Sequence, residues 1–281
     1  MESGFYLRYT LIVSYLGVNG VDAVRGNYYH KHISEAEPTT ASMPLVHVCD
    51  SFTFRKIMVS GVIAPSYCKV FEKDLSYFFY GRPSYRVSSQ EQTTNAKSMF
   101  PICFILEPSS VSTISDAYPF DTGAFCAGIF SGYVHPKSEV SDYKFINQMD
   151  FIQRFVGYFY SNNTSYYDGL PSIAQQNLPA MAFELHSLYQ LITTESNEKF
   201  DDRCHTIEIQ TEEDVDINSG AIKAMVLPAS IASDPEVASF MFDKNIEPII
   251  YHTTRCAPSD LSTTIIDHVR NFYKTEGVVA S

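Results

Sequence analysis

The sequence predicts an α+β fold, in which short extended segments alternate with amphipathic helices along 281 residues. The apolar run PICFILEP at 101–108 has the length and the bounding prolines of a buried strand. Apolar residues recur at helical spacing over 145–159 and again over 181–192, which predicts two helices. The chain shows no internal repeat, and its hydrophobic share of 45% is ordinary for a domain with a proper core.

The first 43 residues carry the weakest pattern. The apolar run within 9–24 is interrupted by Asn19 and Asp22 and is shorter than the ~20 residues of a membrane span, so a short buried strand is the alternative. It also lacks a basic leader with a small-residue cleavage site, so we expect no signal peptide and no membrane association. Residues 25–43 are polar and end in Pro, Thr and Ser, which is typical of a linker. We therefore expect an N-terminal arm or extra strand over 1–43 and a single domain over 44–281, with a helical insertion at about 140–200.

The region 44–83 predicts a strand, a helix and an aromatic strand in that order. LVHV at 45–48 precedes Asp50, a good helix N-cap, and the helical spacing that follows stops at Gly61. Residues 74–80 are dense in aromatic side chains and lead into Gly81-Arg82-Pro83. Glycine and proline favour a turn there, which would present the arginine.

The rest of the chain alternates in the same way. The polar loop SNNTSYYDGLPS at 161–172 lies between the two predicted helices and is a candidate lid or recognition element. TIEIQ, AIKAMVLP and EPIIYH predict strands, and Asp234 followed by Pro235 predicts the start of a helix between the last two. A last helix is expected over 259–274, ending before Gly277.

The composition limits the classes of function. Lys and Arg number 20 against 32 Asp and Glu, and the resulting charge of −12 argues against binding along a nucleic-acid backbone. Six cysteines occur without a CxxC pair or the short Cys/His spacing of structural zinc, so we expect a reduced, cytoplasmic chain without a metal site. With 19 Tyr, 20 Phe and no Trp, a pocket for a flat ligand must use single-ring aromatics.

Three segments together resemble the DarT-like branch of the ADP-ribosyltransferase superfamily, whose members use NAD and whose best-known representatives modify single-stranded DNA. LVHVCDSFTFRKIMVSGVIAP is similar to the family's opening strand with its His-x-Thr, helix and glycine, so that His47 matches the histidine. SYFFYGRPSYR looks like its aromatic stretch with an arginine turn at Arg82. DRCHTIEIQTEEDVDINSGAIKAMVLP is similar to its arginine, strand-borne glutamate and second apolar strand, matching Arg203 and Glu208.

The resemblance implies an ADP-ribosyltransferase-like core, a split mixed or antiparallel β-sheet with flanking helices, and NAD as substrate. Glu208 and Arg82 would be catalytic: the glutamate would bind the reactive ribose and act as base, and the arginine would pair with the diphosphate or orient the acceptor. Binding of NAD would fall to the set His47, Cys49, Tyr77, Phe78, Tyr80 and Arg203. Cys49 stands where the family usually has Thr, and the segments 118–125 and 161–172 have no counterpart in the family pattern.

Each residue also has a plain structural interpretation. His47 alone would be a hydrogen-bonded core histidine, and Arg82 a turn arginine paired with an acid. Glu208 lies between two isoleucines on a strand and points away from them, which alone indicates a solvent-facing residue. The cluster at 212–214 indicates a solvated turn, with Gln210-x-Glu212 as the alternative acidic motif of protein-modifying relatives. The Asp-Thr-Gly at Asp121 resembles the loop of an aspartic protease, but the sequence contains no second Asp-Thr-Gly or Asp-Ser-Gly to supply the partner aspartate, so a tight turn is expected.

The leading functional hypothesis is a mono-ADP-ribosyltransferase, a toxin or anti-phage defence effector that modifies a macromolecular acceptor, either protein or single-stranded nucleic acid. Such a protein could have a neutralising antitoxin as partner. NAD hydrolysis is a close variant, and a non-catalytic interaction protein that retains the fold is an alternative of another class. A cysteine hydrolase built on Cys126 with His135 or His186 is a third, although a buried, inert cysteine is the default expectation.

Overall fold

A mixed β-sheet organises the protein, as the computed structural model shows for residues 27–84, 92–194 and 202–280. Its strand order is β10-β9-β5-β1-β4-β7-β6, and β3 pairs with β4. Only β9 and β10 among these strands run parallel; the other pairings are antiparallel. The strands of this sheet are β1 (Leu45–Asp50), β3 (Ser66–Cys68), β4 (Lys73–Tyr80), β5 (Pro101–Leu106), β6 (Asp116–Tyr118), β7 (Glu208–Thr211), β9 (Ile222–Pro228) and β10 (Glu247–Tyr251). A separate pair is formed by β2 (Val62–Ile63) and β8 (Val215–Asp216).

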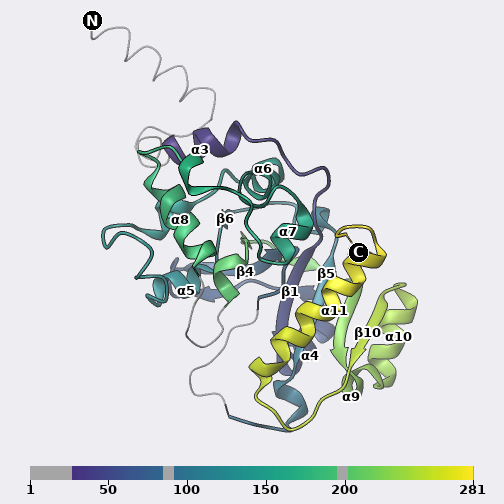
Figure 1. Ribbon diagram of the computed structural model, residues 1–281. Helices are drawn as coiled ribbons and strands as arrows, with labels where there is room; N and C mark the ends of the chain where they lie inside the picture. Colours follow the sequence, from purple (N-terminus) through teal and green to yellow (C-terminus); the bar gives the residue numbers. More distant parts are fainter. Residues whose placement is uncertain (1–26, 85–91, 195–201, 281) are drawn as a thin grey trace, which may run out of the picture.

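Helices surround this sheet and confirm the expected α+β class (Figure 1). The α-helices are α3 (Asn27–Ser34), α4 (Ser51–Ser60), α5 (Thr122–Cys126), α6 (Met149–Tyr160), α7 (Asn163–Tyr167), α8 (Phe183–Thr193), α9 (Ala229–Ala232), α10 (Pro235–Asp243) and α11 (Ser262–Thr275). Short 3₁₀ turns are η1 (Lys97–Met99), η2 (Pro108–Ser110), η3 (Val140–Tyr143), η4 (Gln175–Asn177), η5 (Asp202–His205) and η6 (Pro258–Leu261). Figure 1 places α3, α6 and α8 at the β6 end of the sheet and α9 and α10 at the β10 end.

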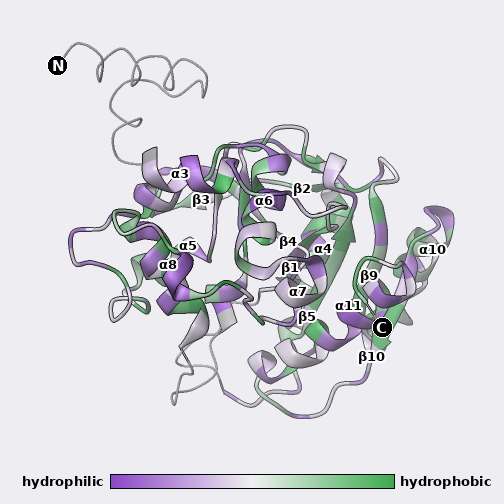
Figure 2. Ribbon diagram, turned by 45° about the horizontal axis from the view of Figure 1, so that its top comes forward, coloured by the Kyte–Doolittle hydropathy of each residue, from purple (hydrophilic) through white to green (hydrophobic). Residues whose placement is uncertain are grey.

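The two faces of the sheet have different contents, because side chains alternate along each strand. Phe79 pairs with both Val46 and Glu208, so these side chains share one face, which we call the Glu208 face. His47 pairs with Phe104 and lies on the opposite, His47 face. Helix α4 covers the His47 face, since the ring of Phe54 lies 5.7 Å from that of Phe104. The central strands are the hydrophobic part of the ribbon in Figure 2.

The local sequence signals for β1 and α4 are confirmed in detail. Asp50 caps α4 by accepting a hydrogen bond from the Thr53 amide at 2.7 Å, which satisfies one of the free N–H groups of the first turn. Gly61 ends the helix in the left-handed conformation at φ 77°, where a residue without a Cβ is favoured. The predicted strand at 101–108 is β5, buried along its whole length. Asp234 caps α10 and Pro235 begins it, as expected.

Two segments expected to be irregular are folded. The polar segment 25–43 contains helix α3, which packs on α6 and α8 and buries Tyr29 and Ile33 completely. These two residues are four positions apart and therefore lie on one side of the helix. The loop 161–172 contains α7, in which Tyr166 and Tyr167 are each 1% exposed. The strand considered within 9–24 falls outside the described residues.

No helix in the described parts of the chain combines the length and the apolar character needed to cross a bilayer.

Candidate active site around Glu208

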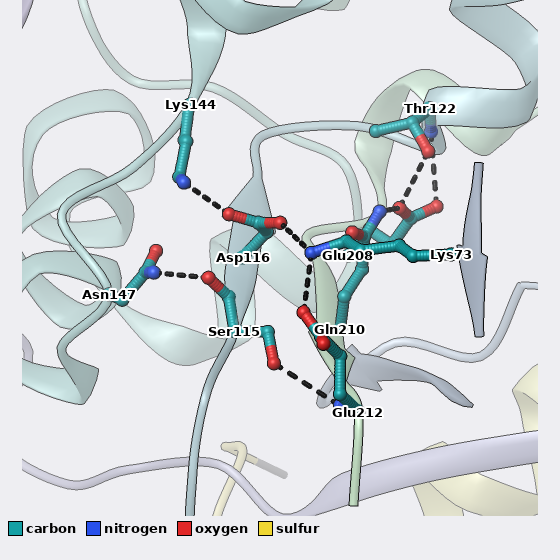
Figure 3. Close-up of polar contacts among 9 residues, drawn as sticks. All are labelled: Lys73, Ser115, Asp116, Thr122, Lys144, Asn147, Glu208, Gln210 and Glu212. Atoms are coloured by element: carbon teal, nitrogen blue, oxygen red, sulfur yellow. Dashed lines mark hydrogen bonds and ion pairs between the residues drawn. The ribbon is translucent and has the colours of Figure 1, made fainter. Parts of the chain in front are cut away.

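The carboxyl group of Glu208 is the centre of the most complete polar cluster in the described structure. Glu208 begins β7, and its carboxyl is held by two residues (Figure 3). Thr122 donates from its backbone N–H to Oε2 at 3.1 Å and from its hydroxyl to Oε1 at 2.7 Å. Gln210, the next residue on the same face of β7, donates from Nε2 to Oε1 at 2.6 Å. Three donors therefore fix the plane of one carboxyl group.

Burial makes this carboxyl an unusual acid. Glu208 is only 2% exposed, and the alternation that points it away from the isoleucines is as predicted, but the solvent-facing interpretation is wrong. Burial raises the pKa of Glu208 to about 8, with a further rise from the negative charge of Asp121, while the hydrogen bonds from Gln210 and Thr122 act in the opposite direction. Near neutral pH the group can therefore both give and take a proton, as a general acid or base must.

Aromatic and thiol side chains surround the Glu208 carboxyl. Tyr77, the register partner of Gln210, is half-buried; its pKa is raised by burial first, then by a hydrogen bond with Cys68 and by the charge of Glu208. Tyr118 is paired with Glu208 on the β6 side, and the half-buried ring of Phe71 stacks on it at 5.8 Å. Tyr77 and Phe71 are therefore the partly exposed aromatic residues of this group.

An ionic network borders the cluster at the edge of the sheet. Lys73 lies between two carboxylates, 3.0 Å from Asp116 and 2.7 Å from Glu212 (Figure 3). Lys144 forms a second ion pair with Asp116 from the segment that leads into α6. Asp116 is the register partner of Gln210 across the ladder of β6 and β7. The network thus fixes edge strand β6 beside the residue that orients Glu208.

Arg82 lies beneath α7 rather than in an open turn. Gly81 adopts the expected positive φ, but the arginine side chain is only 7% exposed, so the prediction that the turn presents it is wrong. A Cβ at Gly169, directly after α7, would come within 2.9 Å of its Nη1. The pKa of His205 is lowered to about 3, first by burial and then by the Arg82 charge. Tyr166 closes this cluster by donating from its hydroxyl to the Tyr80 carbonyl at 2.9 Å.

His47 belongs to the other face of the sheet. Its Nδ1 is 2.8 Å from the Tyr77 carbonyl oxygen, and its ring packs against Phe78 at 5.4 Å and Phe104 at 6.1 Å. Burial lowers the pKa of the imidazole, so it is neutral at pH 7. Cys49, on the same face, is 8% exposed, and burial raises the pKa of its thiol. This is the hydrogen-bonded histidine of the plain interpretation, with a side chain that is partly buried.

The predicted residues therefore fall into separate groups. Glu208 and Tyr77 lie together. His47, Cys49 and Phe78 share the His47 face, and Phe78 is wholly buried there. Tyr80 is also wholly buried, with its hydroxyl accepting from the Met43 amide at 3.0 Å. The Arg203 carbonyl accepts from the Asp121 amide at 3.1 Å, which ties the segment before β7 to α5.

Thr122 is the site residue that sequence reasoning missed, and Gln210 was considered only as part of the alternative motif Gln210-x-Glu212. Asp121 is the helix N-cap of α5, accepting from the Ala124 amide at 2.7 Å, so the Asp-Thr-Gly begins a short helix where a tight turn was expected. The contact of this helix start with β7 spans 86 residues of sequence. The contact of Gln210 with Glu208 was predictable, because strand alternation places the two residues on the same face.

Cys126 is exposed, so the expectation of a buried cysteine is wrong. Its pKa is raised by burial of part of the side chain and by the charges of Glu208, Cys68 and Asp121, which disfavours the reactive thiolate. His135 interacts with the Lys137 amide through Nδ1, and His186 lies 3.1 Å from the Pro179 carbonyl. These contacts give no support to a thiol–imidazole pair.

The described residues contain no group of three or more His, Cys, Asp or Glu side chains arranged to hold a metal ion. Comparison of the chain with protein-family models, with curated proteins and with solved structures finds no match.

Proposed function

We propose that the protein is an enzyme of the mono-ADP-ribosyltransferase type, which takes NAD as its substrate and uses Glu208 as its acid–base group. The observation that carries the proposal is the Glu208 carboxyl, buried, held by three hydrogen bonds and poised to titrate near pH 8. Perturbed carboxyls of this kind are typical of functional sites. The resemblance of three segments to the DarT-like branch is the reason for proposing NAD as the substrate.

Transfer of ADP-ribose from NAD requires a carboxylate beside the reacting ribose. Cleavage of the bond between nicotinamide and ribose C1′ passes through an oxocarbenium-like transition state, which a nearby anion stabilises. In its ionised form Glu208 would accept a hydrogen bond from the ribose and take the proton from the incoming acceptor hydroxyl or amine. Tyr77 is the half-buried aromatic ring beside this carboxyl and is therefore the residue to which we assign nicotinamide stacking.

The proposal departs from the family pattern at two residues. His47 is given no contact with NAD, since its side chain projects from the face opposite to Glu208. Its role is to hold the backbone of Tyr77 by a hydrogen bond. Arg82 is given a structural role, because its guanidinium lies against Gly169 and close enough to His205 to lower the pKa of that imidazole.

The placement of Arg82 against Gly169 and His205 favours a second candidate function, a non-catalytic interaction protein with the same fold. Such a protein would retain the cluster of Arg82, Gly169 and His205 and would not turn over NAD. The two candidates differ in one measurable property, the release of nicotinamide.

For the acceptor, a protein is favoured over nucleic acid. The net charge of −12 opposes binding of a polyanion. Arg55 and Lys56 both lie on α4 with their charged ends over the ring of Phe52, on the helix that covers the His47 face. These cations therefore do not join Glu208 in a basic groove.

The test is incubation of the full chain with NAD labelled in its adenosine part, together with protein, DNA and RNA acceptors. We expect nicotinamide release and label on protein, and loss of both in Glu208→Gln. Glu213→Gln is the matched control, because Glu213 is an exposed carboxylate that bonds Ser112 and Thr113 and should leave the rate unchanged. Absence of nicotinamide release by the unmodified chain would overturn the enzyme proposal in favour of the interaction protein.

A further inference from the structure

Gln210 is buried in an arrangement that suits only one ionisation state of its neighbour. The side chain has no exposed surface, and its Nε2 donates to Glu208 Oε1 at 2.6 Å. Its own Oε1 is buried and has no hydrogen-bond partner among the described residues. Figure 3 shows the amide nitrogen beside the Glu208 carboxyl oxygen that also accepts from the Thr122 hydroxyl.

The hydrogen bonds of Glu208 are those of a carboxylate. Its three partners, one from Gln210 and two from Thr122, all donate in the arrangement described. An ionised carboxyl accepts only, whereas a protonated one carries an O–H that needs an acceptor. At 2% exposure, leaving that O–H without a partner is costly. Uptake of a proton by Glu208 therefore requires an acceptor close by.

Two groups within reach can accept: the Thr122 hydroxyl, which would have to turn its own hydrogen away from Glu208, the one acceptor described for it, and the amide oxygen of Gln210, which has no partner among the described residues. Rotation of the amide by half a turn about its last side-chain torsion exchanges Nε2 and Oε1, and this torsion is broad and roughly two-fold. After the rotation Oε1 would accept from the protonated Glu208 and would gain the partner that it lacks. The two orientations of the amide thus match the two ionisation states of the carboxyl.

We propose that Gln210 is a positioning residue for Glu208, whose side-chain amide reverses when the carboxyl takes up a proton. The carboxyl is then held in one orientation in both states, as acid–base use of a single group requires. The inference concerns Glu208 as the acid–base group and in that respect rests on the proposed function. The ionisable neighbours that also face Glu208 or flank Gln210 are Cys68 on β3, Lys73 and Tyr77 on β4, Asp116 and Tyr118 on β6, and Asp121 and Cys126 at α5.

The test is nuclear magnetic resonance of the full chain without NAD, titrated from pH 6 to pH 9. The Glu208 carboxyl carbon reports its ionisation, and the contact between the Gln210 amide protons and the Thr122 side chain reports the orientation of the amide. Nε2 of Gln210 and the Thr122 hydroxyl share Oε1 of Glu208 as acceptor in the ionised form. We expect this contact to be strong at high pH and to weaken with the same midpoint as the carboxyl.

A substitution of Gln210 gives an independent test through the titration midpoint of Glu208. Gln210→Met keeps the approximate shape of the side chain and removes its amide. We expect the titration midpoint of Glu208 to rise by about 0.5 to 1 pH unit, because the amide's hydrogen bond to the ionised carboxylate is stronger than its hydrogen bond to the protonated carboxyl. The exposed glutamine of α8 gives the control Gln190→Met, which should leave the midpoint unchanged.

An amide contact that stays constant through the Glu208 midpoint would overturn the reversal, as would an unshifted midpoint in a folded Gln210→Met. If Gln210→Met does not fold, the titration of the unmodified chain still shows whether the Gln210 amide reverses when Glu208 takes up a proton. Neither measurement involves NAD, so failure here and absence of nicotinamide release are separate results.

Discussion

The side chains of His47 and Glu208 project from opposite faces of one sheet, with β4 between their two strands. The backbone of Tyr77 is the link between them, since its carbonyl bonds His47 while its ring lies beside the Glu208 carboxyl. A ligand seated on Glu208 therefore has the sheet between itself and the imidazole. We place the reaction on the Glu208 face alone.

The first prediction concerns the close contact that holds the N-terminal segment on α6. A Cβ at Gly157 would come within 2.0 Å of the Glu37 carbonyl oxygen, and neighbouring bonds join Gln153 to the backbone of Thr39. Gly157→Ala should lower the free energy of unfolding by about 1–3 kcal/mol, as for overpacked sites. Urea unfolding measures this.

Gly132→Ala is the control for this change, because a Cβ there meets nothing within 4 Å. Its effect should stay within about 0.5 kcal/mol. Equal stability of the two variants would contradict the packing of segment 37–39 on α6.

The second prediction concerns the pH dependence of stability. The folded pKa of Glu208 is raised to about 8, so between the ordinary carboxyl range and pH 8 the folded state binds the extra proton. Its contribution is fully present below the unfolded pKa and is lost as the pH rises through about 8. Relative to Glu208→Gln, the unmodified protein should therefore lose stability across this window, with a limiting slope of about 1.4 kcal/mol per pH unit.

Urea unfolding of both proteins at pH 5, 6, 7 and 8 gives the difference directly. The depressed pKa of His205 affects both proteins alike, so it cancels in the subtraction. A difference that does not change with pH would show that Glu208 titrates at its ordinary value.

The third prediction concerns Arg82 and His205. Burial is the larger cause of the low His205 pKa and the Arg82 charge the smaller one. Arg82→Met should therefore raise the pKa of His205 above about 3 while leaving it below the ordinary histidine value. Magnetic resonance of the His205 ring follows this titration.

The control for this experiment is Arg154→Met, which removes an arginine that pairs with Asp150 on α6. It should leave the His205 titration in place. A His205 pKa that is the same in Arg82→Met as in the unmodified protein would remove the arginine from this cluster.

A structural feature could be predicted from the sequence where it depends on residues that are close together in the chain. The cap at Asp50 and the stop at Gly61 depend on residues within one or two turns, and both are confirmed. The direction of Glu208 depends only on strand alternation and was also predictable. Its burial depends on Thr122, which is distant in sequence, and so a solvent-facing residue was the natural but wrong expectation.

The same reasoning explains the errors at Arg82 and in the segment 25–43. The turn after β4 follows from glycine and proline, but the cover over the arginine comes from α7 and Gly169. Helix α3 is short and polar in composition, and its stability comes from packing Tyr29 and Ile33 against α6 and α8. Neither of these tertiary contacts can be recognised from the sequence close to the residues involved.

The central claim is that Glu208 is the acid–base group of an NAD-cleaving site, and nicotinamide release as a function of pH tests it most directly. We expect the rate to rise with a midpoint near pH 8 as Glu208 ionises, and to be reduced by at least about 100-fold in Glu208→Gln, in line with the loss of a general base. Release that is equally fast in Glu208→Gln, or no release at any pH, would contradict the claim.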